Sequence, residues 1–187
     1  MSRPFFVVGT PRSRTAWLAA FLSTSGRPCL HEPSRLLATR VELLEMLRAP
    51  AAAISDSGLT LRWRDIKDQS PDARVVVVRR PVEGVMASLA ILGLNSPAAR
   101  RAVVAIDAEI SSLIGSMRAM VVPYRELQAQ LTCEQVYEFC LGVVPPAGHW
   151  AEWARRNVQA NVRSRIEDVQ ANASGIAEVF PELVAAG

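Results

Sequence analysis

The chain has 187 residues, half of them hydrophobic, and a formal net charge of +3. This length accommodates one domain with a buried core and is short for two, so we expect a single domain over residues 1–187 whose part from about residue 145 is mainly helical. No apolar run is long enough to span a bilayer, and the N-terminal apolar stretch is too short for a secretory signal, which favours a cytoplasmic protein without a membrane partner.

Short apolar runs alternate with helical patterns along the chain. Strands are predicted over residues 5–9, 28–32, 52–56, 74–78 and 120–122. A first helix is predicted from Thr15 and is ended by Gly26 and Pro28, and a second runs to Arg48 with Ser34 as its cap. Further helices are predicted over residues 81–92 and 96–117. Two more are predicted to begin at Tyr124 and at the cap Thr132. The alternation predicts an α/β fold with a mostly parallel central sheet flanked by helices, of the P-loop nucleotide-binding type.

The basic residues are almost all arginines, and Lys67 is the only lysine. Arginine suits bidentate contacts with phosphate or sulfate oxygens, so the position of each arginine matters more than their number. A lysine-rich tail, a long basic block and an RNA-binding aromatic motif are all missing from the sequence. We therefore expect no nucleic-acid partner.

The chain contains three cysteines, Cys29, Cys133 and Cys140, and no CxxC pair. An odd number without paired spacing argues against a disulfide framework and against a zinc site, and we expect no metal. Cys133 and Cys140 lie seven residues apart in a helical pattern, so we predict that both face the core.

The segment Gly9–Thr15 lies between the first strand and the first helix. The first amides of a helix are unpaired and lie at the positive end of its dipole, which favours an anion there. The segment lacks the lysine and the second glycine of a Walker A loop, and the strongest strand ends in Arg79-Arg80 instead of an aspartate that could help hold magnesium. The pattern favours phosphate binding, and the alternative is an ordinary loop with solvated arginines.

Three blocks of the sequence share motifs with one enzyme family. Residues 7–18, VVGTPRSRTAWL, look like the signature P-[KR]-S-G-T-[TS]-[WL]-L, and residues 75–89, VVVVRRPVEGVMASL, are similar to a strand–R-x-P–helix–S segment. Residues 121–127, VVPYREL, resemble a V-x-Y-E-D-L strand end. In this order the blocks resemble the sulfotransferases that use PAPS (3′-phosphoadenosine 5′-phosphosulfate), over roughly the first two thirds of the chain.

The resemblance implies a role for each matched residue. The cofactor would be PAPS, the product PAP (adenosine 3′,5′-bisphosphate), and no metal would be needed. In the family the first block holds the 5′-phosphosulfate and the second holds the 3′-phosphate. Arg12 would also act in catalysis by neutralising charge, and Ser88 could instead be a small packing residue. The implied cofactor-binding residues are Pro11, Arg12, Ser13, Arg14, Thr15, Ala16, Arg79 and Ser88.

The sequence departs from the family pattern in three places. Arg14 stands where glycine is usual, so either the backbone differs or Arg14 adds a phosphate contact. Arg79 and Ser88 are one residue farther apart than in animal cytosolic members. The C-terminal R-K-G element is absent, and the candidates to replace it are Arg155, Arg156, Arg163 and Arg165.

Sulfuryl transfer requires in-line geometry, charge stabilisation and a base for the acceptor. His31-Glu32, at the end of the predicted second strand, is the best candidate for that base, with Glu32 preferred to His31. In relatives with this architecture the base is a histidine or a glutamate. Glu32 could instead support the start of the next helix.

The predicted function is transfer of a sulfuryl group from PAPS to a hydroxyl or amine of a small-molecule or carbohydrate acceptor. Acceptor specificity resides in loops that carry no readable pattern here. Two alternatives stay open: an atypical P-loop kinase or other nucleotide phosphotransferase, and a degenerate non-catalytic nucleotide-binding domain. The apolar C-terminal helices are candidates for a homodimer interface.

Overall fold

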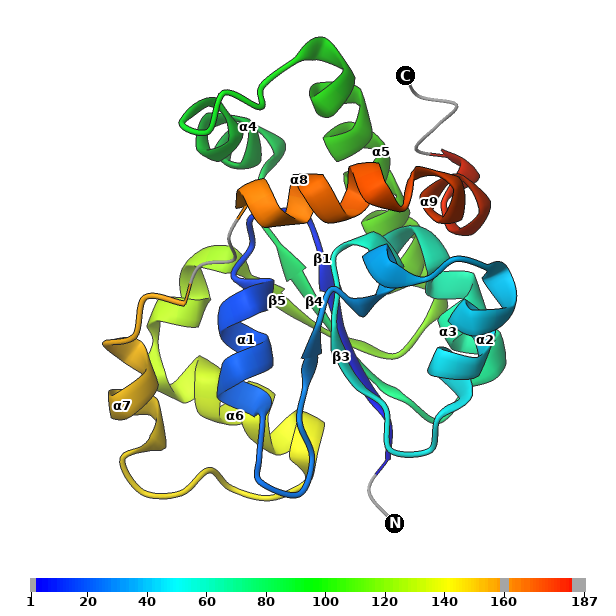
Figure 1. Ribbon diagram of the computed structural model, residues 1–187. Coiled ribbons are helices and arrows are strands. Elements are labelled where there is room, and N and C mark those ends of the chain that lie inside the picture. Colours follow the sequence, from blue (N-terminus) through cyan, green and yellow to red (C-terminus); the bar gives the residue numbers. More distant parts are fainter. Residues whose placement is uncertain (1–2, 159–161, 183–187) are drawn as a thin grey trace.

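The protein is described here from a computed structural model covering residues 3–158 and 162–182. Five strands form one all-parallel sheet in the order β2-β3-β1-β4-β5 (Figure 1). The strands are β1 (Phe5–Gly9), β2 (Leu30–His31), β3 (Ala53–Ser55), β4 (Arg74–Arg79) and β5 (Ala119–Pro123). The predicted fold class is confirmed, because the sheet is parallel and helices flank it.

Helices cover both faces of the sheet (Figure 1). One face carries α1 (Thr15–Leu22) and α6 (Gln130–Leu141), and the other carries α2 (Arg40–Arg48), α3 (Trp63–Gln69) and α5 (Pro97–Ser116). The remaining elements are α4 (Val82–Ala90), α7 (His149–Ala154), α8 (Val162–Ala171), α9 (Ala173–Val179) and the 3₁₀ turns η1 (Pro33–Leu36), η2 (Gly58–Arg62) and η3 (Tyr124–Gln128). Across the described ranges, no helix is both long and apolar enough to cross a membrane.

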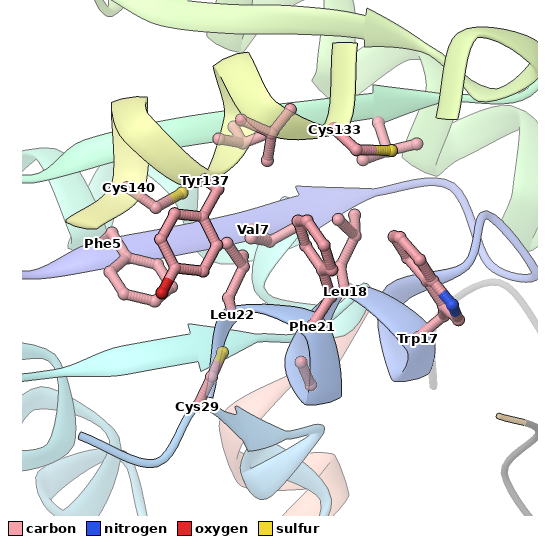
Figure 2. Packing of buried hydrophobic residues seen from close by; sticks show 14 of the residues in the cluster. Phe5, Val7, Trp17, Leu18, Phe21, Leu22, Cys29, Cys133, Tyr137 and Cys140 are labelled. Carbon is pink, nitrogen blue, oxygen red and sulfur yellow. The ribbon is translucent and has the colours of Figure 1, made fainter. Parts of the chain in front are cut away.

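The central strands are buried on both faces, which explains why they read as continuous apolar runs. Along β1, Phe5 and Val7 contribute to one core while Phe6 and Val8 contribute to the other. Figure 2 shows the first core, in which side chains of α1 and α6 meet over β1. Cys133 and Cys140 are both buried there, as predicted.

The predicted helix from Ser34 to Arg48 is wrong at its start. Residues 33–36 form the turn η1, the backbone is extended at Leu37, and α2 begins only at Arg40. Thr39 caps α2 in a capping box: its hydroxyl accepts from the Glu42 amide at 3.2 Å, and the Glu42 carboxylate accepts from the Thr39 amide at 3.2 Å. This reciprocal pair satisfies two amides that would otherwise be unpaired, and so it fixes the helix start.

Two further helix starts were predicted, one at Ser96 and one with Thr132 as its cap. Ser96 caps α5, since its hydroxyl accepts from the Ala99 amide at 3.1 Å. Thr132 does not cap α6, which already begins at Gln130 after the extended residue Ala129. An N-cap residue has an extended backbone of its own, as Ser96 does, whereas Thr132 already lies inside α6.

Candidate functional site

The loop Thr10–Arg14 leaves the carboxyl end of β1 and leads into α1, where the sequence predicts an anion site. Hydrogen bonds fix its shape: the Ser13 hydroxyl donates to the Thr10 carbonyl at 2.6 Å, and the Arg80 amide donates to the Thr10 hydroxyl at 3.0 Å. The Ser13 hydroxyl is thus buried within the loop. Pro11 is half-buried within the loop. Thr15 and Ala16 open α1.

Arg12 and Arg14 both adopt left-handed backbone conformations, with φ of 61° and 67°. Non-glycine residues rarely do so, and such strain is common at functional sites. Arg14 therefore keeps the backbone that the family's glycine would favour, and the departure lies in its side chain alone. That side chain donates to the Leu127 carbonyl at 3.0 Å and lies over the Trp17 ring.

We expect Arg14→Gly to be more stable than Arg14→Ala by about 1 kcal/mol, because only glycine adopts this conformation without steric cost. Both variants lose the contacts to Leu127 and Trp17, so each is the control for the other. Urea unfolding monitored by tryptophan fluorescence measures the difference. Equal stabilities would contradict the left-handed conformation at this position.

Three guanidinium groups surround the loop: those of Arg12, Arg14 and Arg80. Arg12 Nε donates to Ser88 Oγ at 3.2 Å, and Arg80 Nη1 donates to the Arg12 carbonyl at 2.7 Å. Arg80 also lies over the Tyr124 ring at 4.5 Å. Within residues 3–158 and 162–182, none of the three pairs with a carboxylate within 4.0 Å. The loop and the N-terminus of α1 therefore lie in a strongly positive environment suited to anions.

Arg79 lies on the face of β4 that packs toward α5, and its side chain also lines the cavity at the carboxyl ends of β4 and β5. Its Nε and Nη2 atoms donate to the two carboxylate oxygens of Asp107 on α5, at 2.9 Å and 2.8 Å, and hydrogen bonding to this carboxylate raises the pKa of Arg79. Side chains alternate along a strand, so Arg79 continues the face of Val75 and Val77, which packs toward α5. Arg80 instead faces the loop.

His31 and Glu32 lie at the carboxyl end of β2, close to the start of α1. His31 Nε2 is 3.4 Å from the Thr15 hydroxyl and 3.8 Å from Glu32 Oε1. The Ser57 hydroxyl donates to Glu32 Oε1 at 3.2 Å. Burial raises the pKa of Glu32 and lowers that of His31, because both charged forms lose hydration. The tertiary structure thus brings both predicted base candidates to the anion loop.

Glu32 does not cap the following turn, so that alternative reading is wrong. Although Glu32 is the N-cap residue of η1, its side chain makes no capping hydrogen bond. Asp56 has this role: its Oδ2 accepts from the Ser34 amide at 3.0 Å and its Oδ1 from the Gly58 amide at 2.8 Å. Asp56 is fully buried, and desolvation raises its pKa.

A cavity of about 880 Å³ opens beside Arg80, at the carboxyl ends of β4 and β5. Pro81 and Val82 at the start of α4 form one side, and Tyr124 and Arg125 after β5 form the other. Cavities of this volume accommodate nucleotide-sized ligands, and ligands of open α/β sheets bind at these strand ends.

Of the arginines proposed to replace the R-K-G element, Arg155 and Arg156 do not line this cavity. Arg156 pairs with Glu152 and lies over the Trp153 ring, and Arg155 is exposed on the same segment. The side chains of Arg163 and Arg165 lie outside the described part of the structure.

No family model and no curated protein matches the sequence. Among solved structures, the chain resembles the crystal structure of a sulfotransferase from Alicyclobacillus acidocaldarius, with a TM-score of 0.53 and 16% identity. The likeness covers 98% of this chain and 97% of that one. The chain has a sulfotransferase-like fold. The likeness extends over the whole length of both chains, so the fold includes the C-terminal region as well as the sheet.

Proposed function

We propose that this protein is a PAPS-dependent sulfotransferase acting on a small-molecule or carbohydrate acceptor. The observation that carries the proposal is the contact between Arg12 and Ser88, at 3.2 Å, together with that between Arg80 and the Arg12 carbonyl, at 2.7 Å. These contacts join the loop after β1 to α4, which follows β4. Two basic segments far apart in the sequence thereby lie side by side, which supports a single anion site.

The chemistry of this donor set fits PAPS, which carries negative groups at both its 5′ and its 3′ positions. The loop 11–16 and the amides of α1 would hold the 5′-phosphosulfate, with Arg12 balancing its charge. Arg80 and Ser88 would hold the 3′-phosphate, and the cavity beside Tyr124 would take the nucleoside. Bound there, PAPS would supply the sulfuryl group.

Glu32 would act as the general base toward the acceptor. Its carboxylate is held by Ser57, and its raised pKa makes it a better proton acceptor than an exposed glutamate. Arg12 and the amides of α1 would stabilise the negative charge that develops on the departing phosphate without requiring a metal. His31 would orient the site through its contact with Thr15 at 3.4 Å.

Calorimetric titration of PAP, without added metal, tests the cofactor site. We expect micromolar binding that weakens roughly 10- to 100-fold in Arg12→Ala and in Arg80→Ala, since each removes charged hydrogen bonds to a phosphate. The matched control is the double variant Arg64→Gln/Glu109→Gln, which removes an ion pair between α3 and α5 outside the cavity without changing the net charge. It should bind PAP within about threefold of the wild type.

Two results would contradict the proposal. Binding of ATP with magnesium in place of PAP would favour the phosphotransferase alternative. No binding of either nucleotide would favour a degenerate domain.

A further inference from the structure

The backbone at Glu32 is strained in a way that the residue itself does not explain. Glu32 has φ 47° and ψ 49°, in the left-handed region, and it precedes Pro33. Non-glycine residues avoid this region, and a following proline pushes a residue toward extended conformations instead. The conformation therefore persists only because other groups hold it.

Arg35 is the side chain that binds the carbonyls of this turn. Its Nη1 atom donates to the His31 carbonyl at 3.2 Å and also to the Glu32 carbonyl. Only 18% of the Arg35 side chain is exposed, so these carbonyls are shielded from water that could replace the guanidinium. Arg35 thus supplies two hydrogen bonds to the strained turn, in addition to those made by the Glu32 amide with Ser55 and by Asp56 with the Ser34 amide.

Arg35 is in turn held from the far end of the chain. Its Nε atom donates to Asp168 Oδ2 on α8 at 2.9 Å. Asn172, just after α8, donates to the Arg35 carbonyl at 3.0 Å and to the Leu37 carbonyl at 2.7 Å. Figure 1 shows α8 running across the end of the molecule where β1 and β4 finish. Residues of α8 and its C-terminal end therefore contact both the Arg35 side chain and the backbone of η1.

We infer that Arg35 is a positioning residue through which α8 sets the conformation of Glu32 and so its competence as the base. This inference rests on the proposed function of Glu32. The pair Asp168–Arg35 orients the guanidinium, and the guanidinium fixes the two carbonyls that flank the Glu32 peptide. Loss of the Asp168 carboxylate would let Arg35 turn away and let the strained turn relax.

Other contacts tether the C-terminal helices without touching this turn. Arg62 pairs with Glu182, and the Arg40 amide donates to Glu178 at 3.0 Å. Glu182→Gln therefore weakens the attachment of the same region through a different arginine, and it is the matched control for Asp168→Asn. Asp168→Glu retains the carboxylate and serves as the conservative variant.

The first measurement is amide hydrogen exchange at Glu32 in the free protein, followed by NMR. The Glu32 amide donates to the Ser55 carbonyl at 2.9 Å, so its exchange reports opening of this turn. We expect about tenfold faster exchange in Asp168→Asn, with wild-type behaviour in Glu182→Gln and near recovery in Asp168→Glu. Equal exchange in all variants, or equal acceleration in Asp168→Asn and Glu182→Gln, would overturn the inference.

The second measurement separates positioning from binding. Asp168→Asn should lower kcat for sulfuryl transfer about tenfold while the Kd for PAP stays within about twofold, because the phosphate-binding arginines are untouched. A parallel loss of PAP affinity would overturn the inference. If the wild type neither binds PAP nor transfers sulfate, the proposed function fails, and the exchange measurement still decides whether α8 controls the Glu32 turn.

Discussion

Replacing Glu32 by glutamine is expected to lower kcat for sulfuryl transfer by roughly 10²- to 10⁴-fold, the usual contribution of a general base. Glutamine has nearly the same size and can still accept from the Ser57 hydroxyl, so the turn should keep its shape. It cannot take up the acceptor proton. The Kd for PAP, measured by calorimetry, should change only a few-fold.

The pH dependence of kcat should identify the same group. Burial raises the pKa of Glu32 above its ordinary value of 4.5, while Ser57, Arg35 and Arg12 act against this shift. Asp56 and His31 are the other titratable groups in this cluster. Since the carboxylate is the active form, activity should fall as the pH drops through this raised pKa. The acidic limb should disappear in Glu32→Gln.

Removing this carboxylate should also stabilise the protein at neutral pH. The folded state retains the Glu32 proton to higher pH than the unfolded state, because burial raises the pKa of this side chain in the fold alone. The free energy of unfolding therefore decreases as the pH rises through this interval. Glu32→Gln escapes that loss, so its thermal midpoint at pH 7 should exceed that of the wild type.

Two further variants test this assignment. Glu138→Gln removes an exposed carboxylate on α6 and should leave both kcat and stability unchanged. His31→Asn should lower kcat far less than Glu32→Gln. If instead His31→Asn abolishes transfer and Glu32→Gln retains it, His31 is the base.

Gly9→Ala is expected to destabilise the fold by at least about 4 kcal/mol, or to prevent folding, the range seen when a substitution forces a clash inside a core. A Cβ atom at Gly9 would lie 2.1 Å from the Val78 carbonyl oxygen of the neighbouring strand. The backbone cannot shift away easily, because the Gly9 amide and carbonyl both bond to the Thr60 hydroxyl, at 2.9 Å and 3.0 Å. Chemical denaturation and soluble yield measure the effect.

The matched control is Gly115→Ala. Gly115 lies in α5, is exposed, and has no heavy atom of another part of the described chain within 4 Å of an added Cβ. Alanine there should stabilise the protein by about 0.5–1 kcal/mol, because it lowers the entropy cost of the helix. A Gly9→Ala protein with wild-type stability would show that β1 and β4 are not packed as closely as the structure indicates.

The sequence alone was enough to predict the parallel α/β class and the strand–loop–helix at β1, and to propose an anion site there with His31-Glu32 as the base candidates. These features depend on short-range patterns. A strand buried on both faces must be continuously apolar, and an anion loop must follow such a strand and precede a helix. The strands β1 and β4 carry this pattern most clearly, and both lie where predicted.

Only the tertiary structure decided which arginine faces the loop and what holds Glu32. Arg79 and Arg80 are adjacent and chemically identical, and the choice between them depends on which face of β4 packs against α5, where Asp107 captures Arg79. The contact from Asp168 to Arg35 joins residues 133 positions apart in the chain. Such pairings leave no pattern in the neighbouring sequence, because they follow from the order of the strands and the path of α8 past the strand ends.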